Sequence, residues 1–295
     1  MNLFIEGIPG MGKSTFLNKI AMEHPEYQVY REGDYSPVEL AWCACMTEEE
    51  YRTTLLRYHA ISEEIERWTV QEQVTSETAS FRSGCGRPLI RYIVPYTRII
   101  TDEFGFHKSL EQFEIYQGRK SLGEFQQIIL GRYKAFVESL GVLKTEVSEK
   151  PAEDKRNEMN GQKVTLMECA FFQNILEELM LYFECTNQEI FAFYQKLFAI
   201  VRTTDFKLYY LYDEDVEKFI GHIAKERSDA RGNMLWYPMM LGYLQESPYG
   251  KKHAFRGMED VVAHFRRRQK LELWIIREIL GDRAVVIPAW HEAKS

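Results

Sequence analysis

The stretch Asn2 to Glu23, NLFIEGIPGMGKSTFLNKIAME, decides the fold of this chain. Its first residues, 2–6, form a short apolar run that stops at a glycine, which is typical of a buried parallel strand entering a tight turn. Apolar residues then recur at helical spacing over 14–23. The pattern therefore predicts a strand, a glycine-rich loop and a helix in direct succession.

The loop between this strand and this helix, Gly7 to Thr15, satisfies the pattern G-x-x-x-x-G-K-S. Its glycines let successive backbone N–H groups turn toward phosphate oxygens, and the positive end of the helix dipole points at the same place. In this arrangement Lys13 reaches the β- and γ-phosphates, Ser14 offers its hydroxyl to Mg²⁺, and Thr15 contacts the α-phosphate. The residues predicted to bind ATP are Gly7, Gly10, Met11, Gly12, Lys13, Ser14 and Thr15.

The rest of the chain supplies a pattern of strands and helices around this start. Further apolar runs with the composition of core strands lie at 27–30, 164–167, 207–211 and 284–287. Helical patterns separate the later runs at 171–183, 187–202, 213–227 and 259–280. Parallel strands need crossovers and bury both faces, so we expect a five-stranded parallel sheet with helices on both faces. The fold class predicted is α/β, a P-loop NTPase fold with a large helical insertion.

The segment 47–162 interrupts the predicted sheet. It opens with an N-cap at Thr47 and carries apolar residues at helical spacing as far as Trp68, which predicts one long helix over 47–74. A glycine-rich turn at 83–86, an apolar run at 90–94, helices at about 108–116 and 121–140, and a polar mobile loop at 145–162 are predicted to follow. We expect the two halves of the core at 1–46 and 163–295, and a helical substrate-lid region between them.

The amino-acid composition limits the classes of binding partner and predicts the cellular compartment. The net charge of −7 and the pI near 5.7 argue against a general nucleic-acid binder, which needs an excess of basic residues on one face. No run is long and apolar enough for a membrane span. The odd number of cysteines and the lack of CxxC spacing predict reduced thiols, and hence a cytoplasmic protein. The sequence does not indicate the oligomeric state, so a homodimer is one of the alternatives.

Together with the N-terminal loop, acidic and basic residues at later strand ends resemble those of the nucleoside and nucleotide kinase group of P-loop proteins, such as thymidylate kinases and deoxynucleoside kinases. The second predicted strand leads into an acidic turn with Glu32 and Asp34, Glu168 follows the third, and Arg227 ends a basic segment after the fourth. The resemblance implies that Asp34 or Glu32 orients the phosphoryl acceptor or acts as base, that Glu168 lies near Mg²⁺ or the acceptor, and that Arg227 clamps phosphate. With Lys13, we take Asp34, Glu168 and Arg227 as the candidate catalytic residues.

Alternative readings of these charged residues remain open. The acidic turn could instead cap a helix that starts near Pro37, and the basic runs at 225–231 and 266–268 could be solvated helix faces. The third strand also departs from the kinase pattern, because Glu168 is followed by Cys169 and not by arginine. Arg31, Arg119 and Arg132 are candidates to replace that arginine.

The sequence thus predicts an ATP- and Mg²⁺-dependent kinase that phosphorylates a small-molecule acceptor of the nucleoside or nucleotide type. Guanine-specific and ABC-type signatures are absent, and no strand ends in two acids as in motor ATPases. Two alternatives remain, a P-loop ATPase that acts as a regulatory switch and an antibiotic-modifying kinase. No nucleic-acid or membrane partner is expected.

Overall fold

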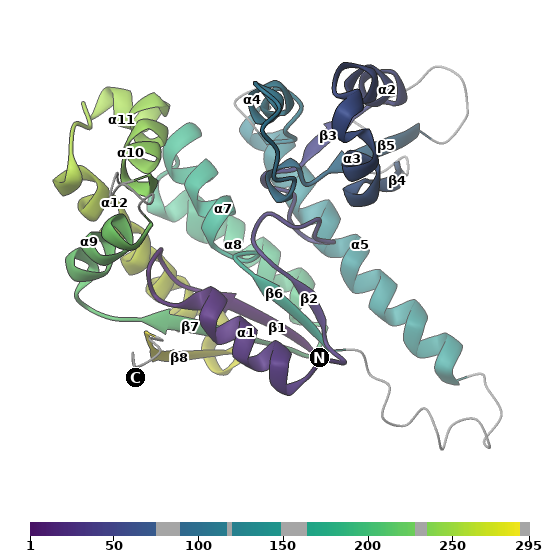
Figure 1. Cartoon of the computed structure of the whole chain (residues 1–295). Helices are drawn as coiled ribbons and strands as arrows, with labels where there is room; N and C mark the ends of the chain where they lie inside the picture. The colour runs from purple at the N-terminus through teal and green to yellow at the C-terminus, as the bar shows by residue number, and fades with distance from the viewer. Residues whose placement is uncertain (75–88, 117–119, 149–163, 228–234, 290–295) are drawn as a thin grey trace. The chain divides into compact units, whose positions relative to one another are not determined.

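The chain is described here by a computed structural model that covers residues 1–74, 89–116, 120–148, 164–227 and 235–289. These residues form two compact units (Figure 1). The first unit comprises 1–29 and 144–295, and the second comprises 30–143. The predicted turn at 83–86, and Arg119 and Arg231, lie outside the described residues.

The main sheet contains the five parallel strands predicted from the apolar runs. They are β1 (Asn2–Glu6), β2 (Gln28–Tyr30), β6 (Thr165–Glu168), β7 (Phe206–Tyr212) and β8 (Ala284–Pro288), in the spatial order β2-β6-β1-β7-β8. Ile5 in the central strand lies opposite Glu168 on one side and Tyr209 on the other. Every residue of β1 is buried, which is why this strand is apolar throughout its middle.

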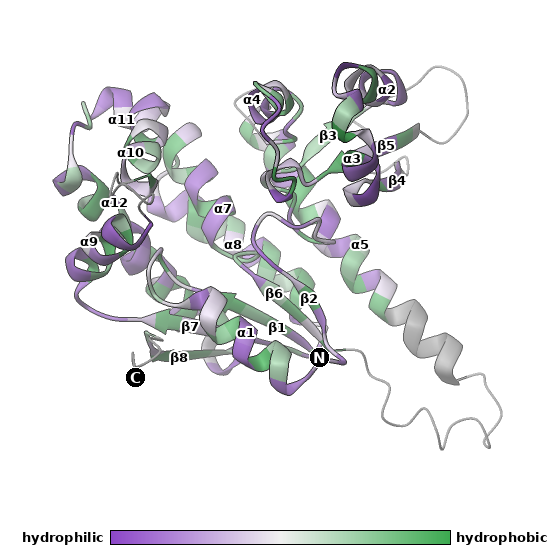
Figure 2. Cartoon of the chain, viewed as in Figure 1, coloured by the Kyte–Doolittle hydropathy of each residue, from purple (hydrophilic) through white to green (hydrophobic). Residues whose placement is uncertain are grey.

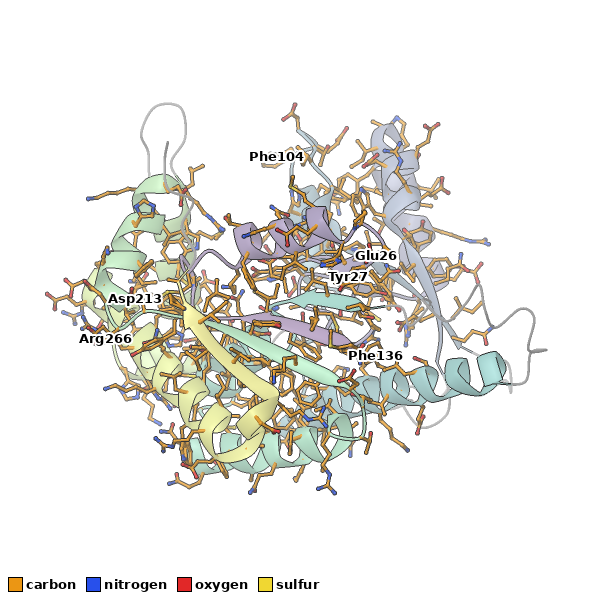
Figure 3. All side chains as sticks on the ribbon, turned by 90° about the horizontal axis from the view of Figure 1, so that it is seen from below. Glu26, Tyr27, Phe104, Phe136, Asp213 and Arg266 are labelled. Atoms are coloured by element: carbon orange, nitrogen blue, oxygen red, sulfur yellow. The ribbon has the colours of Figure 1, made fainter. Side chains whose placement is uncertain are left out.

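Helices cover both faces of this sheet, as Figure 3 shows in a view along its layers. Successive side chains of β7 alternate between the faces. Tyr209 packs against Phe16 of α1 (Lys13–Glu23), whereas Tyr210 binds Glu272 of α12 (Met258–Ile275). The further helices of the first unit are α7 (Gln173–Glu177), α8 (Asn187–Val201), α9 (Val216–Glu226), α10 (Trp236–Glu246) and α11 (Pro248–Lys252). In addition, α7 and α12 each continue into a π-helical turn, Glu178–Tyr182 and Ile276–Leu280.

The second unit contains a three-stranded antiparallel sheet as well as helices, which the expected helical insertion did not include. Its strands are β3 (Ala44–Met46), β4 (Val70–Val74) and β5 (Leu89–Val94), in the order β3-β5-β4. Its helices are α2 (Glu48–Arg57), α3 (Ser62–Trp68), α4 (Phe106–Glu111) and most of α5 (Leu122–Ser148). Buried aliphatic and aromatic side chains, among them Met46, Val94 and Phe106, form a core of its own.

The single long helix predicted over 47–74 is also wrong. The α-helix stops at Arg57, a 3₁₀ turn at His59–Ile61 follows, and α3 ends at Trp68. The residues after Trp68 pair with β5 as strand β4, although their apolar residues do not alternate along the chain. The start of the expected loop at 145–162 is wrong as well, since α5 extends to Ser148, and residues 149–162 lie outside the described part of the chain.

Colouring by hydropathy agrees with this packing, since the strands of the main sheet are mostly hydrophobic and α2 and α9 carry many hydrophilic residues (Figure 2). Among the described residues, no helix combines the length and the apolar character needed to cross a membrane.

Candidate functional site

The loop after β1 has a backbone that only glycine adopts readily. Gly7, Gly10 and Gly12 have φ angles of 143°, 86° and 82°. A Cβ atom on Gly7 would lie 2.6 Å from the carbonyl oxygen of Leu211, and one on Gly10 would lie 2.9 Å from that of Phe219. The loop therefore lies against the end of β7 and against α9 so closely that these two positions exclude any side chain.

Lys13, the first residue of α1, folds back over this loop. Its ammonium group donates to the carbonyl oxygens of Gly7 at 2.9 Å and Ile8 at 3.2 Å, and the residue is buried. An ammonium has three protons, so these two bonds leave one donor for a further acceptor. The positively charged group is thus held at the N-terminal end of a helix, where the backbone also favours an anion.

Ser14 connects the loop to the neighbouring strand β6. Its hydroxyl donates to the carboxylate of Glu168 at 2.5 Å. Glu168 is the last residue of β6 and is buried, and the next residue, Cys169, turns the chain sharply with φ of 58°. The carboxyl ends of β1 and β6 therefore bring a hydroxyl and a carboxylate together, as expected for ligand sites in open parallel sheets.

This pair suits magnesium bound together with a phosphate. Mg²⁺ is commonly held by one or two protein oxygens plus substrate phosphates and water, and not by a dedicated protein cage. Among the described residues, no cluster of three His, Cys, Asp or Glu side chains is arranged for a metal. Ser14 and Glu168 are the residues that would hold the ion.

A buried ionic cluster, which we call the Arg268 cluster, contacts the loop at the carbonyl oxygen of Gly7. It consists of Glu177, Tyr210, His264, Arg268 and Glu272. The guanidinium of Arg268 donates to Glu177 at 2.6 Å, to Glu272 at 2.8 Å and to the carbonyl oxygen of Gly7 at 3.3 Å. The second oxygen of each carboxylate is also bound, by His264 at 2.8 Å and by Tyr210 at 2.5 Å respectively.

The charges of this cluster fix the ionisation of Glu177. Burial alone raises the pKa of this carboxyl, but the nearby His264 and Arg268 outweigh burial and hold the pKa at about 2. Glu177 is therefore ionised at neutral pH. Burial lowers the pKa of the Arg268 guanidinium, yet its two carboxylate partners, Glu272 and Glu177, hold that pKa well above its ordinary value. The guanidinium therefore stays charged despite its burial.

Glu6 immediately precedes the loop, and its pKa is shifted in the opposite direction from that of Glu177. Burial raises its pKa to about 8, opposed by the backbone N–H of Phe171, which donates to its carboxyl at 2.6 Å. The charge of Glu272 raises this pKa further and that of Lys13 lowers it. Its second oxygen, Oε2, is buried and has no hydrogen-bond partner among the described residues.

Asp34, the candidate base, belongs to the second unit and is occupied by local contacts. Its carboxylate accepts from the backbone N–H of Arg31 at 2.8 Å and lies 2.9 Å from the guanidinium of Arg98. Arg98 in turn stacks over Trp68 at 5.6 Å. The acidic turn is therefore held closed by its own carboxylate, and a role for Asp34 in catalysis remains a prediction.

The candidate arginines differ in their surroundings. Arg227 is exposed and ends α9, where its carbonyl oxygen accepts from the backbone N–H of Leu235 at 3.0 Å. Arg132, in the second unit, is bound to Glu72 by both terminal nitrogens and to the Ser36 carbonyl at 2.7 Å. Arg132 is therefore occupied within its own unit, whereas the phosphate role of Arg227 remains a prediction.

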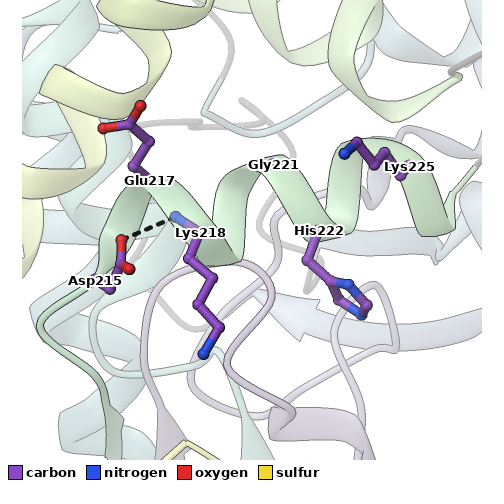
Figure 4. A pocket seen from close by; sticks show the side chains of 6 residues that line it. All are labelled: Asp215, Glu217, Lys218, Gly221, His222 and Lys225. Atoms are coloured by element: carbon purple, nitrogen blue, oxygen red, sulfur yellow. Dashed lines mark hydrogen bonds between the residues drawn. The ribbon is translucent and has the colours of Figure 1, made fainter.

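The outer face of α9 forms a shallow hollow near the loop (Figure 4). Asp215 caps this helix by accepting from the backbone N–H of Lys218 at 3.0 Å. Lys218 and His222 lie on the same side of the helix in the close-up, with Lys225 on another side. The hollow is lined by basic and acidic side chains together, so its charge favours no single ligand.

Sequence reasoning missed the Arg268 cluster and Glu6. The basic run 266–268 was expected to be a solvated helix face, which holds for Arg266 but is wrong for Arg268, 1% exposed. A signal was present in the sequence, because Arg268 follows the buried Phe265 at helical spacing and precedes Glu272 by four residues. A charged residue in the apolar stripe of a helix indicates a buried ion pair.

The fold and site together define a class, an α/β protein with an open parallel sheet and a glycine-rich, lysine-containing loop at the carboxyl end of its central strand. Comparison of the chain with protein-family models, curated proteins and solved structures finds no match. The assignment of a function therefore rests on the loop sequence and on the contacts described above.

Proposed function

We propose that this chain is a P-loop phosphotransferase that moves the γ-phosphate of ATP to a hydroxyl or phosphate of a small molecule of the nucleoside or nucleotide type. The observation that carries the proposal is the hydrogen bond between Ser14 and Glu168, next to Lys13 at the carboxyl ends of two adjacent strands. Phosphoryl transfer depends mainly on positioning and charge stabilisation, and these groups supply both.

Each residue has a distinct part in the proposed chemistry. The loop amides and the free proton of Lys13 bind the phosphate chain, and Lys13 faces the charge that develops on the γ-phosphate. Ser14 and Glu168 orient the metal end of the nucleotide, where Mg²⁺ would neutralise phosphate charge. Arg227, at the exposed end of α9, would add a second cation, and Asp34 or Glu32 would orient the acceptor.

The direct test is the substitution Lys13→Ala, followed by the release of ADP from ATP in the presence of Mg²⁺ and an acceptor. We expect phosphoryl transfer to fall by about a hundredfold or more, because one donor to the transition-state charge is lost. The exposed lysine of the same helix, Lys19→Ala, serves as the matched control. Turnover at the wild-type level in a folded Lys13→Ala protein would refute the role of this residue.

The contacts of Asp34 favour a second candidate function, an ATPase that acts as a regulatory switch. A kinase needs a group that orients its acceptor, and the carboxylate of Asp34 is bound to Arg98. A switch needs no pocket for a second substrate, because water is its only acceptor.

Acceptor dependence separates these functions. For a kinase, ADP release should rise strongly with one member of a panel of nucleosides, nucleotides and aminoglycosides. An aminoglycoside response would identify an antibiotic-modifying kinase with the same chemistry. Slow hydrolysis that no acceptor stimulates would support the switch.

A further inference from the structure

Arg268 lies directly behind the loop that the proposed function assigns to ATP. Its side chain is 1% exposed, and its Nη2 atom donates to the Gly7 carbonyl oxygen at 3.3 Å. The same carbonyl accepts from Lys13 at 2.9 Å. The first peptide unit of the loop is therefore held by two cations that come from different helices.

We propose that Arg268 is a positioning residue, which fixes the Gly7 peptide so that the loop keeps its phosphate-binding shape when Lys13 turns to a phosphate. The inference rests on the proposed function. Lys13 spends two of its three protons on loop carbonyls, so a shift of the ammonium toward an anion weakens those bonds. A buried carbonyl left without a donor is costly, and Arg268 removes that cost for Gly7.

The surroundings of Arg268 suit a positioning role, because its guanidinium cannot easily move. Glu177 holds one terminal nitrogen and Glu272 holds the Nε atom. These carboxylates are in turn fixed by His264 and Tyr210, which belong to α12 and β7. A planar guanidinium offers its donors in a rigid fork, so three acceptors in three directions determine its orientation.

The conformation of Gly7 explains why its peptide must be held in place. Its φ angle is 143°, and a Cβ atom on Gly7 would lie 2.6 Å from the carbonyl oxygen of Leu211, so the chain at this point runs close to β7. Rotation of this peptide would redirect the next N–H groups of the loop, which are the groups that face phosphate oxygens. A misplacement of about 1 Å in such a site is sufficient to reduce function by roughly a hundredfold.

The inference predicts a loss of nucleotide affinity on the substitution Arg268→Lys. A lysine keeps the buried positive charge between Glu177 and Glu272, but its single ammonium cannot span those carboxylates and the Gly7 carbonyl together. We expect the Kd for ATP with Mg²⁺, measured by titration calorimetry on the full chain, to rise by about tenfold or more, as for loss of a charge-assisted hydrogen bond.

The matched control is Arg283→Lys, which also disrupts a partly buried arginine whose guanidinium donates to a backbone carbonyl, that of Thr204 at 3.1 Å. Arg283 immediately precedes β8, at the amino ends of the strands and away from the loop, so the Kd of this variant for ATP should equal that of the wild-type chain. Thermal unfolding of both variants measures any general loss of stability. A purely structural role for Arg268 would lower its unfolding temperature and leave the Kd of the folded protein unchanged.

A second variant guards against misfolding of the first. The double substitution Arg268→Met with Glu272→Gln removes one buried charge of each sign and leaves Glu177 with His264. Replacement of a buried ion pair by neutral groups is often tolerated. A folded double variant should also bind ATP about tenfold or more weakly.

The possible outcomes separate the inference from the proposed function. A wild-type chain that does not bind ATP overturns both. Wild-type binding, together with an unchanged Kd in Arg268→Lys or in the folded double variant, overturns only the role of Arg268. Weaker binding in these variants, with normal binding in Arg283→Lys, supports it.

Discussion

The two compact units treat buried charge differently. In the first unit, Arg268 and Glu272 lie beneath the loop with side chains 1% and 0% exposed. In the second unit, aliphatic and aromatic side chains form the core, and the ion pair of Arg132 with Glu72 keeps 12% and 28% of its side chains exposed. Removing charges from water is expensive unless all their partners are in place. The free-energy cost of burying charges is therefore larger in the first unit than in the second, and it is concentrated around one loop.

One glycine substitution in each unit compares the packing of the loop beside the buried charges with that of a turn in the second unit. These substitutions have the largest expected effect. Gly7 has φ of 143° and no room for a Cβ atom, whereas Gly105 has φ of 75° and no atom within 4 Å of a Cβ. Gly7→Ala combines backbone strain with a clash, so it should lower the free energy of unfolding by about 3 kcal/mol. Gly105→Ala should cost about 1 kcal/mol from strain alone. Urea denaturation measures both, and equal losses would contradict the contrast.

The part of the fold that follows from local pattern could be read from the sequence. All five strands of the main sheet were predicted, because each is a short, mostly apolar run with glycine or a helical pattern at its ends. The approach of Ser14, in the loop, to Glu168, at the end of β6, also follows from the sequence, since parallel strands end at the same edge of a sheet.

What could not be predicted depends on contacts between distant segments. Strand β4 is short and polar, with the sequence VQEQV, and it becomes a strand only by pairing with β5. Arg268 stands in a run of three arginines, and local spacing indicates its partner Glu272 but not Glu177, which lies 91 residues away in the chain. Local sequence gives charge and spacing, but the partner across the fold decides burial.

Glu6 allows the stability cost of a buried charge in the first unit to be measured as a function of pH. Its pKa is raised from 4.5 to about 8 by burial. A carboxyl with a raised pKa contributes stability that is fully present below pH 4.5 and is lost as the pH rises toward 8. Glu6→Gln cannot ionise, so this part of the pH dependence should vanish. At pH 7 the variant should be more stable than the wild-type chain by up to about 3 kcal/mol.

Denaturation curves between pH 4.5 and 8 check this expectation for Glu6→Gln. Glu63→Gln, at an exposed position of the second unit, is the control and should leave the profile as in the wild-type chain. The charges nearest to Glu6 are those of Glu272 and Lys13, which act in opposite directions. A variant whose stability falls with pH in parallel with the wild-type chain would show that Glu6 is not the titrating group.

The smallest effects come from two helix caps of the same design, one in each unit. Thr47 accepts from the backbone N–H of Glu50 at 3.3 Å, and the carboxylate of Glu50 accepts from the backbone N–H of Thr47 at 2.7 Å. Thr186 and Glu189 repeat this arrangement at 3.3 Å and 2.8 Å. Each threonine supplies an acceptor for a backbone N–H that has no partner within its helix, so either Thr→Ala change should cost about 1 kcal/mol.

The matched caps make it possible to ask whether the two units unfold separately. If they do, Thr47→Ala should speed amide hydrogen exchange in α2 without affecting α8, and Thr186→Ala should do the reverse. The corresponding Thr→Ser variants keep the hydroxyl acceptor and should behave like the wild-type chain. If either alanine variant speeds the slowest exchange in both helices equally, the chain unfolds as one cooperative unit. The stability cost of the Arg268 cluster would then be shared by the second unit as well.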